Sequence, residues 1–352
     1  MSDRRRWADH PLVQLTRVRY REFFREPEAV FWVFIFPVLL AAGLGIAFRN
    51  RAPDRTGVAV VAADTGAARL ADALRAAGEL QVSVLSDSAA AEALRTGEVA
   101  LVVAPAPGGK VEYRYDDTRP ESRIARLLVD DALQRAAGRR DPATVNDRLV
   151  HERGSRYIDF LVPGLLGMNL MGSGIWGVGF AIVDARKKRL LKRLIATPMS
   201  RPQFLASFVL SRLTLLVIEV GLLLGFGALV FGVPLRGSFV VLVTICLVSS
   251  LAFTSLGLLV SSRVQTMEGA SGLMNLVMLP MWIFSGVFFS ASRFPDSIQP
   301  FIQALPLTAV VDALRANILR GAGWGTVAPE LAIILAWLGV SFLLALRLFR
   351  WR

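Results

Sequence analysis

The sequence predicts an α-helical integral membrane protein with six transmembrane helices and a small α/β extracytoplasmic domain between the first and second of them. Two observations lead to this fold class. The chain of 352 residues is 54% hydrophobic, which is too apolar for a soluble domain of this size. One long apolar run is followed by a charged segment, 49–159, and then by five more apolar runs. A hydrocarbon core of ~30 Å needs ~20 apolar helical residues to be crossed.

The six apolar runs are expected to be helices, because lipid offers the backbone no hydrogen-bond partners outside the segment itself. The last run is the shortest and needs its flanking residues to reach across. The predicted spans are 29–48, 160–183, 204–235, 237–262, 269–291 and 331–346.

The distribution of charge predicts the orientation. The net charge is +12, but segment 49–159 contains 17 Lys or Arg and 17 Asp or Glu, so the whole excess lies elsewhere. Seven arginines precede the first span, and seven Lys or Arg lie in 186–201. Cytoplasmic loops are enriched in such residues. We therefore expect a multi-pass protein of the plasma (bacterial inner) membrane with both termini in the cytoplasm. Anionic headgroups account for these charges, and no nucleic-acid partner is expected.

Residues 1–28 form a basic cytoplasmic segment before the first span, 29–48. Arg17, Arg21 and Arg25 recur every four residues on one stripe, with apolar residues roughly opposite and Arg19 interrupting the pattern. Such a helix can lie in the membrane interface with its arginines among the headgroups. The alternative is an ordinary basic anchor, and the sequence leaves both open.

The extracytoplasmic segment 49–158 alternates between strand-like and helix-like pieces, which is typical of a small α/β sheet. Its ~100 residues can form their own core. The expected strands are 57–62, 80–85, 99–104 and 111–115, and the expected helices are 67–77, 88–95 and 120–137.

No residue pattern in this domain predicts catalysis. The loop 105–110 ends in Gly-Lys, but a phosphate-binding loop requires Ser or Thr after the lysine and then a helix, whereas Val111 and a strand follow here. We interpret the loop as a turn between two strands. Cys246 is the only cysteine and no cluster has metal-ligand spacing. The chain is expected to bind no cofactor itself and to be no enzyme.

The segment 184–202 joins the second and third spans on the cytoplasmic side. Proline disfavours helix at the residue before it, so Thr197-Pro198 is expected to end a short helix. The segment is either a basic clamp lying on lipid or a helix presented to a cytoplasmic partner. Its apolar residues at helical spacing (i, i+1, i+4, i+5) are Leu190, Leu191, Leu194 and Ile195.

Three motifs in this order resemble permease subunits of ATP-binding-cassette (ABC) exporters of the type-2 class. They are Leu-Leu-Lys-Arg-Leu-Ile-Ala-Thr-Pro-Met-Ser-Arg at 190–201, Leu-Pro-Met-Trp-Ile-Phe-Ser-Gly-Val-Phe-Phe at 279–289, and Ile-Gln-Ala-Leu-Pro-Leu-Thr-Ala-Val-Val-Asp-Ala-Leu-Arg at 302–315. The large domain after the first span also resembles that family. One departure is that 186–189 is all basic, where many relatives carry a Glu and a Gly.

The resemblance implies a permease without ATPase activity of its own. It implies a separate ABC ATPase subunit, which holds ATP and magnesium and docks on the cytoplasmic helix. It also implies a second permease, as homodimer or heterodimer, with membrane lipids around both. By position, the residues that couple to the ATPase are Leu190, Leu191, Leu194, Ile195, Thr197, Pro198 and Ser200.

Polar residues within the spans are further candidates. Glu219 lies near the middle of the third span, where an ionised side chain is costly, and Arg212 lies seven residues earlier. Two interpretations of these residues stay open. In the structural one, they form an interior ion pair, or the carboxyl of Glu219 is held by hydrogen bonds. In the functional one, they act as a conformational latch or contact the substrate. Asn169 and Asn275 are weaker candidates that are expected to hold helices together.

Segment 292–328 is too polar and too rich in proline to span. We expect short helices on the outer side that dip back into the bilayer, with Asp312 and Arg315 one turn apart. By resemblance to the family, Pro306, Asp312 and Arg315 belong to a cap over the outer end of the transport path.

The sequence therefore favours the permease half of an ATP-driven exporter, moving a hydrophobic or amphipathic substrate, drug-like or lipid-like, out of the cytoplasm or inner leaflet. The alternative is a membrane-anchored sensor or receptor whose extracytoplasmic domain binds a ligand. A secondary transporter is less favoured, because no paired half-repeat is visible.

Overall fold

The computed structural model describes residues 11–48, 55–62, 65–106, 110–140, 154, 156–187 and 201–348. The chain divides into two compact units. One is Asn50–Leu149, and the other combines Met1–Arg49 with Val150–Arg352. Each unit has its own hydrophobic core, and each is described by itself below.

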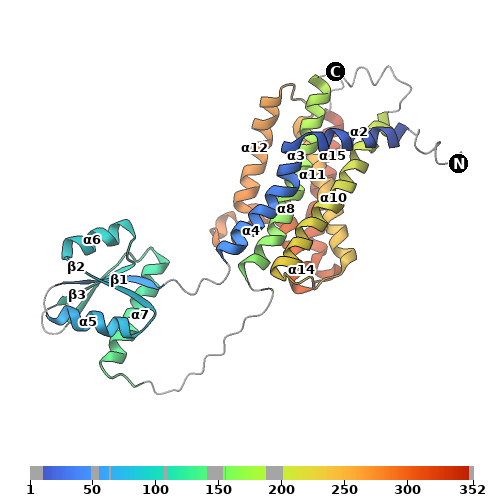
Figure 1. Ribbon diagram of the computed structural model, residues 1–352. Coiled ribbons are helices and arrows are strands. Elements are labelled where there is room, and N and C mark those ends of the chain that lie inside the picture. The colour runs from blue at the N-terminus through green and yellow to red at the C-terminus, as the bar shows by residue number, and fades with distance from the viewer. Residues whose placement is uncertain are drawn as a thin grey trace. The chain divides into compact units, whose positions relative to one another are not determined.

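The larger unit is a helical bundle (Figure 1). A helix across the bundle, α2 (Pro11–Arg25), leads through α3 (Pro27–Val30) and the π-helical η1 (Phe31–Ile35) into α4 (Phe36–Ala47), which runs along it. The long helices that follow are α8 (Tyr157–Lys187), α10 (Arg201–Phe231), α11 (Phe239–Ser261), α12 (Met267–Phe284) and α15 (Trp324–Leu348). Between α12 and α15 lie η2 (Ala291–Arg293), η3 (Asp296–Ile298), α13 (Gln299–Ala304) and α14 (Pro306–Arg320).

Five helices in the described ranges are long and apolar enough to cross a membrane. They are Pro27–Ala47, Tyr157–Asp184, Leu210–Phe231, Phe239–Ser261 and Trp324–Leu348, and they match the first four predicted spans and the last. The last is longer than its apolar run, since its flanking residues continue the helix, as expected.

The fifth predicted span, 269–291, was wrong at its C-terminal end. The helix there, α12, ends at Phe284 and is not among the five helices that meet the length and hydropathy requirements. Gly286 explains this end, because its φ of +72° is a left-handed conformation that stops an α-helix and that glycine adopts without strain.

The predicted broken segment 292–328 contains a sharply bent helix pair. Asp296–Ala304 and Pro306–Arg320 meet at 84°, and together they are a sixth candidate for a span or a re-entrant loop. Pro306 begins α14 after the extended Leu305, which suits a residue whose missing N–H is harmless in the first helical turn. Most of α14 is buried inside the bundle.

Glycines allow α8 and α11 to pack with their backbones close together. A Cβ added to Gly174 of α8 would lie 2.7 Å from the Cβ of Phe253, and one added to Gly257 of α11 would lie 2.8 Å from the carbonyl oxygen of Ile175. Neither helix could keep its position with a side chain there. Small residues at such crossings are the usual means by which membrane helices approach closely.

The arginine that interrupts the α2 stripe, Arg19, belongs to the inner face of the helix. Arg17, Arg21 and Arg25 are exposed, whereas Arg19 is half-buried and donates to Glu22 at 3.1 Å. Desolvation lowers the pKa of Arg19, while the charges of Glu22 and of Asp184 at the end of α8 act in the opposite direction. Arg19 thus interrupts the arginine stripe because its side chain packs against the bundle.

The smaller unit is the α/β fold that the alternating pattern predicts. Its strands β1 (Thr56–Val61), β2 (Leu80–Leu85), β3 (Leu101–Ala106) and β4 (Lys110–Arg114) form one sheet in the order β2-β1-β3-β4. The first three strands are parallel, and β4 runs antiparallel to β3. One face packs on α5 (Thr65–Ala76) and α7 (Pro120–Ala136), and the other on α6 (Asp87–Thr96).

Candidate functional site

A charged pair lies inside the helical bundle. Arg212 and Glu219 are seven residues apart on α10, and two helical turns bring both side chains to one face. Nη1 of Arg212 donates to Oε1 of Glu219 at 2.6 Å, and its Nη2 donates to Oε2 at 3.2 Å. Arg212 is 8% exposed and Glu219 is 1% exposed. The structure thus brings these two predicted residues together as a buried, two-pronged ion pair.

Ser173 joins this pair to α8. Its hydroxyl oxygen accepts a hydrogen bond from Nη2 of Arg212. The single hydroxyl proton has two acceptors within reach, Oε2 of Glu219 at 3.1 Å and the carbonyl oxygen of Asn169 at 2.6 Å. Because one proton serves one acceptor well, the hydroxyl can alternate between the carboxylate of α10 and the backbone of its own helix.

Asn169 extends the network to the first span. Its Nδ2 donates to the carbonyl oxygen of Val33 at 3.0 Å. That carbonyl would accept from the residue four positions later in a regular helix, but the residue is Pro37, which has no N–H. The side chain of Asn169 replaces the missing donor, and the π-helical turn Phe31–Ile35 lies at the same place. Asn169 therefore satisfies a backbone group that proline leaves unpaired.

These contacts form a polar network that links η1, α8 and α10. We define it as Val33, Asn169, Ser173, Arg212 and Glu219. A buried ion pair adds little net stability, but removing one partner leaves a charge without compensation, which costs ~3–5 kcal/mol. The network consequently favours one relative position of the three helices, and α8 and α10 are the two helices that residues 188–200 connect.

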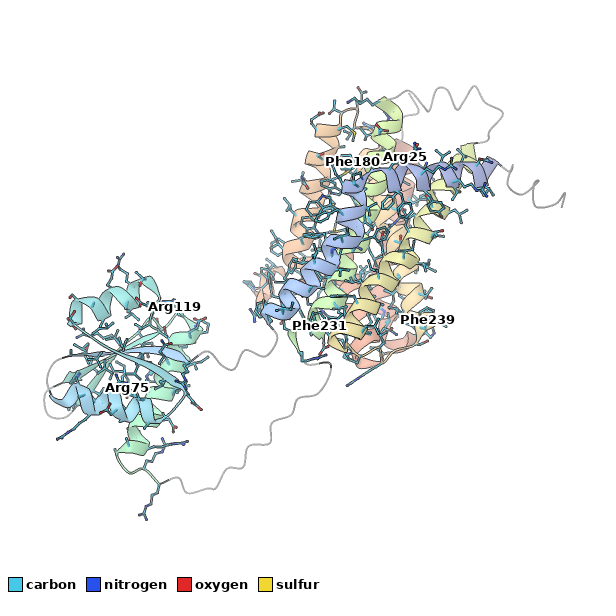
Figure 2. The ribbon with its side chains drawn as sticks, in the orientation of Figure 1. Arg25, Arg75, Arg119, Phe180, Phe231 and Phe239 are labelled. Atoms are coloured by element: carbon cyan, nitrogen blue, oxygen red, sulfur yellow. The ribbon has the colours of Figure 1, made fainter. Side chains whose placement is uncertain are left out.

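Arg315 of α14 is half-buried and makes a second set of polar contacts, at the start of α8. Its guanidinium donates to the carbonyl oxygen of Phe160 at 3.2 Å and to that of Gly286 at 2.6 Å, and lies 3.4 Å from the centre of the Phe160 ring. Arg315 therefore holds together α14, the start of α8 and the loop after α12. Figure 2 places Phe231 and Phe239 at this end of the bundle, and Arg25 and Phe180 at the other.

The other predicted residues lie apart from these contacts. Pro306 is buried at the start of α14, and Asp312 is exposed on the same helix. Asn275 is half-buried on α12, and its side chain makes no hydrogen bond to any residue that the structure describes. The predicted coupling residues all lie in 188–200, outside the described ranges; they are Leu190, Leu191, Leu194, Ile195, Thr197, Pro198 and Ser200.

Sequence reasoning missed two members of the network, Ser173 and the carbonyl of Val33. Both had a signal in the sequence. Ser173 lies four residues after Asn169, on the same helix face, and Pro37 inside an apolar span indicates a carbonyl in need of another donor.

Comparison with known proteins decides the family. The model of the family described as "ABC-2 family transporter protein" matches residues 28–347, which include the smaller unit, most of the larger unit and the whole polar network. The chain belongs to this family. It is accordingly a type-2 ABC permease, a multi-pass membrane subunit of an ABC transporter.

Curated relatives agree with this assignment. ABC transporter G family member 20 of Dictyostelium discoideum is 29% identical over 245 residues, covering 66% of this chain and 33% of the relative. Inner membrane transport permease YhhJ of Escherichia coli is 27% identical over 173 residues, covering 49% and 46%. Linearmycin resistance permease protein LnrN of Bacillus subtilis is 26% identical over 174 residues, covering 49% and 45%. The permease thus spans between a third and a half of the length of these relatives.

Proposed function

We propose that this permease is the membrane half of an ATP-driven exporter, which moves a hydrophobic or amphipathic substrate, drug-like or lipid-like, out of the cytoplasm or the inner leaflet. The observation that carries the proposal is the polar network between α8 and α10, the two helices that flank the segment similar to the family's ATPase-docking motif. The family assignment favours this function over a membrane-anchored sensor. The direct test of the proposal is whether an ATPase subunit co-purifies with the permease after extraction from the membrane in mild detergent.

The proposed mechanism uses two conformations. ATP can favour one of them only through contacts that differ between the two. A separate ATPase subunit, holding ATP and magnesium, docks on residues 190–200 and displaces them when nucleotide binds. Because this segment joins α8 to α10, the displacement changes the position of one helix relative to the other and acts on the pair Arg212–Glu219. Two permeases, identical or different, enclose the path together with lipid.

The orientation follows from the ends of the helices. The exposed arginines of α2 lie at the end of the bundle where Arg25 and Phe180 are seen (Figure 2), and Arg186 and Lys187 end α8, on which Phe180 lies. An excess of basic residues marks the cytoplasmic side. We infer that this end faces the cytoplasm and that the α/β unit lies outside.

Cysteine labelling tests this orientation, because the single native cysteine, Cys246, is buried. We expect Ala89→Cys, at an exposed position of α6, to react with a membrane-impermeant maleimide in intact cells. Lys187→Cys, exposed at the end of α8, is expected to react only after the membrane is opened. The unsubstituted permease serves as the control for background. Labelling of Lys187→Cys in intact cells, with Ala89→Cys protected, would reverse the orientation.

A further inference from the structure

Arg186 makes a contact that the proposed mechanism has not yet used. It lies in the last turn of α8, and one residue, Lys187, separates it from residues 188–200. Its guanidinium donates to three carbonyl oxygens at the end of α11 and directly after it: Nη1 to those of Ser261 at 3.1 Å and Val264 at 2.5 Å, and Nη2 to that of the C-cap, Ser262, at 3.2 Å. A basic residue expected to face lipid or a partner is thus engaged with a neighbouring helix.

The end of α11 requires such a donor. The last four carbonyls of a helix have no partner within it, and many helices satisfy them by turning into a left-handed glycine. Here the C-cap, Ser262, keeps a right-handed conformation with φ −58° and ψ −35°, and residues 262–266 contain no glycine. A guanidinium supplies the missing donors, and its positive charge also suits the negative end of the helix dipole.

The contact is partly shielded from water. Arg186 is half-buried, and desolvation lowers its pKa. Lys187, the next residue, is exposed. Two adjacent basic residues of the same segment thus have different surroundings, and only Arg186 is directed to the carbonyls of α11.

Arg186 adds a polar contact to the packing of α8 against α11. The two helices also make the close backbone contact at Gly174 and Gly257. Gly174 and Arg186 are twelve residues apart, which corresponds to ~18 Å along a helix. Two attachments separated by this length restrict both sliding and tilting of one helix against the other.

We propose that Arg186 is a positioning residue that fixes the end of α8 to the end of α11, so that both helices move together when the coupling segment moves. This inference rests on the proposed function and identifies α11 as the helix that moves together with α8. Nucleotide binding then changes the position of the α8–α11 pair relative to α10, instead of bending the end of α8 alone.

The contact itself is tested on the full-length permease in detergent by hydrogen–deuterium exchange. In Arg186→Gln, amides of the last turn of α11 and of 262–266 are expected to exchange about tenfold faster or more, since charged hydrogen bonds that held this end are lost. The matched control is Lys187→Gln, which removes the same charge one residue later and is expected to exchange as the unsubstituted permease does. Unchanged exchange in Arg186→Gln would overturn the inference.

The coupling is tested on the complex with the ATPase. Spin labels at Gln265→Cys, after α11, and Thr214→Cys, on α10, report the separation of the two helices in a Cys246→Ser background. We expect this distance to change when nucleotide binds, with the ATPase bound in every variant. The size of the change is expected to fall to less than half in Arg186→Gln. It is expected to be largely kept in Arg186→Lys and unaffected in Lys187→Gln.

Two results separate this inference from the proposed function. A full nucleotide-dependent change in Arg186→Gln, or none in the unsubstituted complex, would overturn the role of Arg186 while leaving the ATPase partner established. An unsubstituted permease that binds no ATPase would instead contradict the proposed function. In that case the exchange experiment still decides whether Arg186 holds α11.

Discussion

Glu219→Ala is expected to lower the stability of the permease more than any other change to a polar residue of its interior. The substitution leaves the guanidinium of Arg212 buried with Ser173 as its remaining side-chain partner. Breaking a buried ion pair from one side costs ~3–5 kcal/mol, a large fraction of a typical stability of ~5–15 kcal/mol. Thermal unfolding in detergent, followed by tryptophan fluorescence, measures the effect.

A second variant separates stability from transport. Replacing both members, as Arg212→Met with Glu219→Met, removes the uncompensated charge, and such apolar replacements of buried pairs are often neutral or stabilising. We expect the double variant to fold and to bind the ATPase but to lose most nucleotide-driven transport. Asn275→Ala is the matched control on α12, with little expected effect on either property. Equal losses of stability in Glu219→Ala and Asn275→Ala would contradict a special role for the ion pair.

The second large effect is expected where α8 and α11 touch. In Gly257→Ala the new methyl group would lie 2.8 Å from the carbonyl oxygen of Ile175 and 2.9 Å from that of Gly174. These are backbone atoms that cannot rotate away, so the two helices must separate. Overpacking of this kind costs ~1–3 kcal/mol or more, and here it also widens the contact that holds the bundle together.

Gly172→Ala provides the control for this prediction. Gly172 lies on the same helix as Gly174, but a Cβ added there meets nothing within 4 Å. We expect the melting temperature of Gly172→Ala to equal or exceed that of the unsubstituted permease, because alanine favours helix over glycine, whereas Gly257→Ala unfolds at a clearly lower temperature. Similar melting temperatures would show that the close approach of α8 and α11 does not limit stability.

The sequence predicted those features that depend on local periodicity. Apolar runs of span length located the long helices, and strand–helix alternation predicted the strands and helices of the α/β unit that lie in its described residues. The seven-residue spacing of Arg212 and Glu219 was sufficient to place both on one face of one helix. Each of these inferences needs only neighbouring residues.

Features that depend on a second helix were beyond that reasoning. Asn169 is suited to its place because Pro37, on a different helix, leaves a carbonyl unpaired. Arg186 is indistinguishable in sequence from the basic residues around it, and only the packing of α11 gives it carbonyl acceptors. The C-terminal end of the fifth predicted span is set by the backbone conformation at Gly286. The sequence does not show this end, because the apolar run continues past Gly286.

The central claim, a permease driven by a separate ATPase, is tested most directly by affinity purification from native membranes in mild detergent with mass spectrometry. We expect a stoichiometric ABC ATPase subunit with the unsubstituted permease, lost in Leu194→Asp with Ile195→Asp. Lys187→Asp, which changes the charge by the same amount just outside the coupling residues, is expected to retain it. A permease that is purified without any ATPase, under conditions that preserve a known ABC exporter complex, would contradict the account.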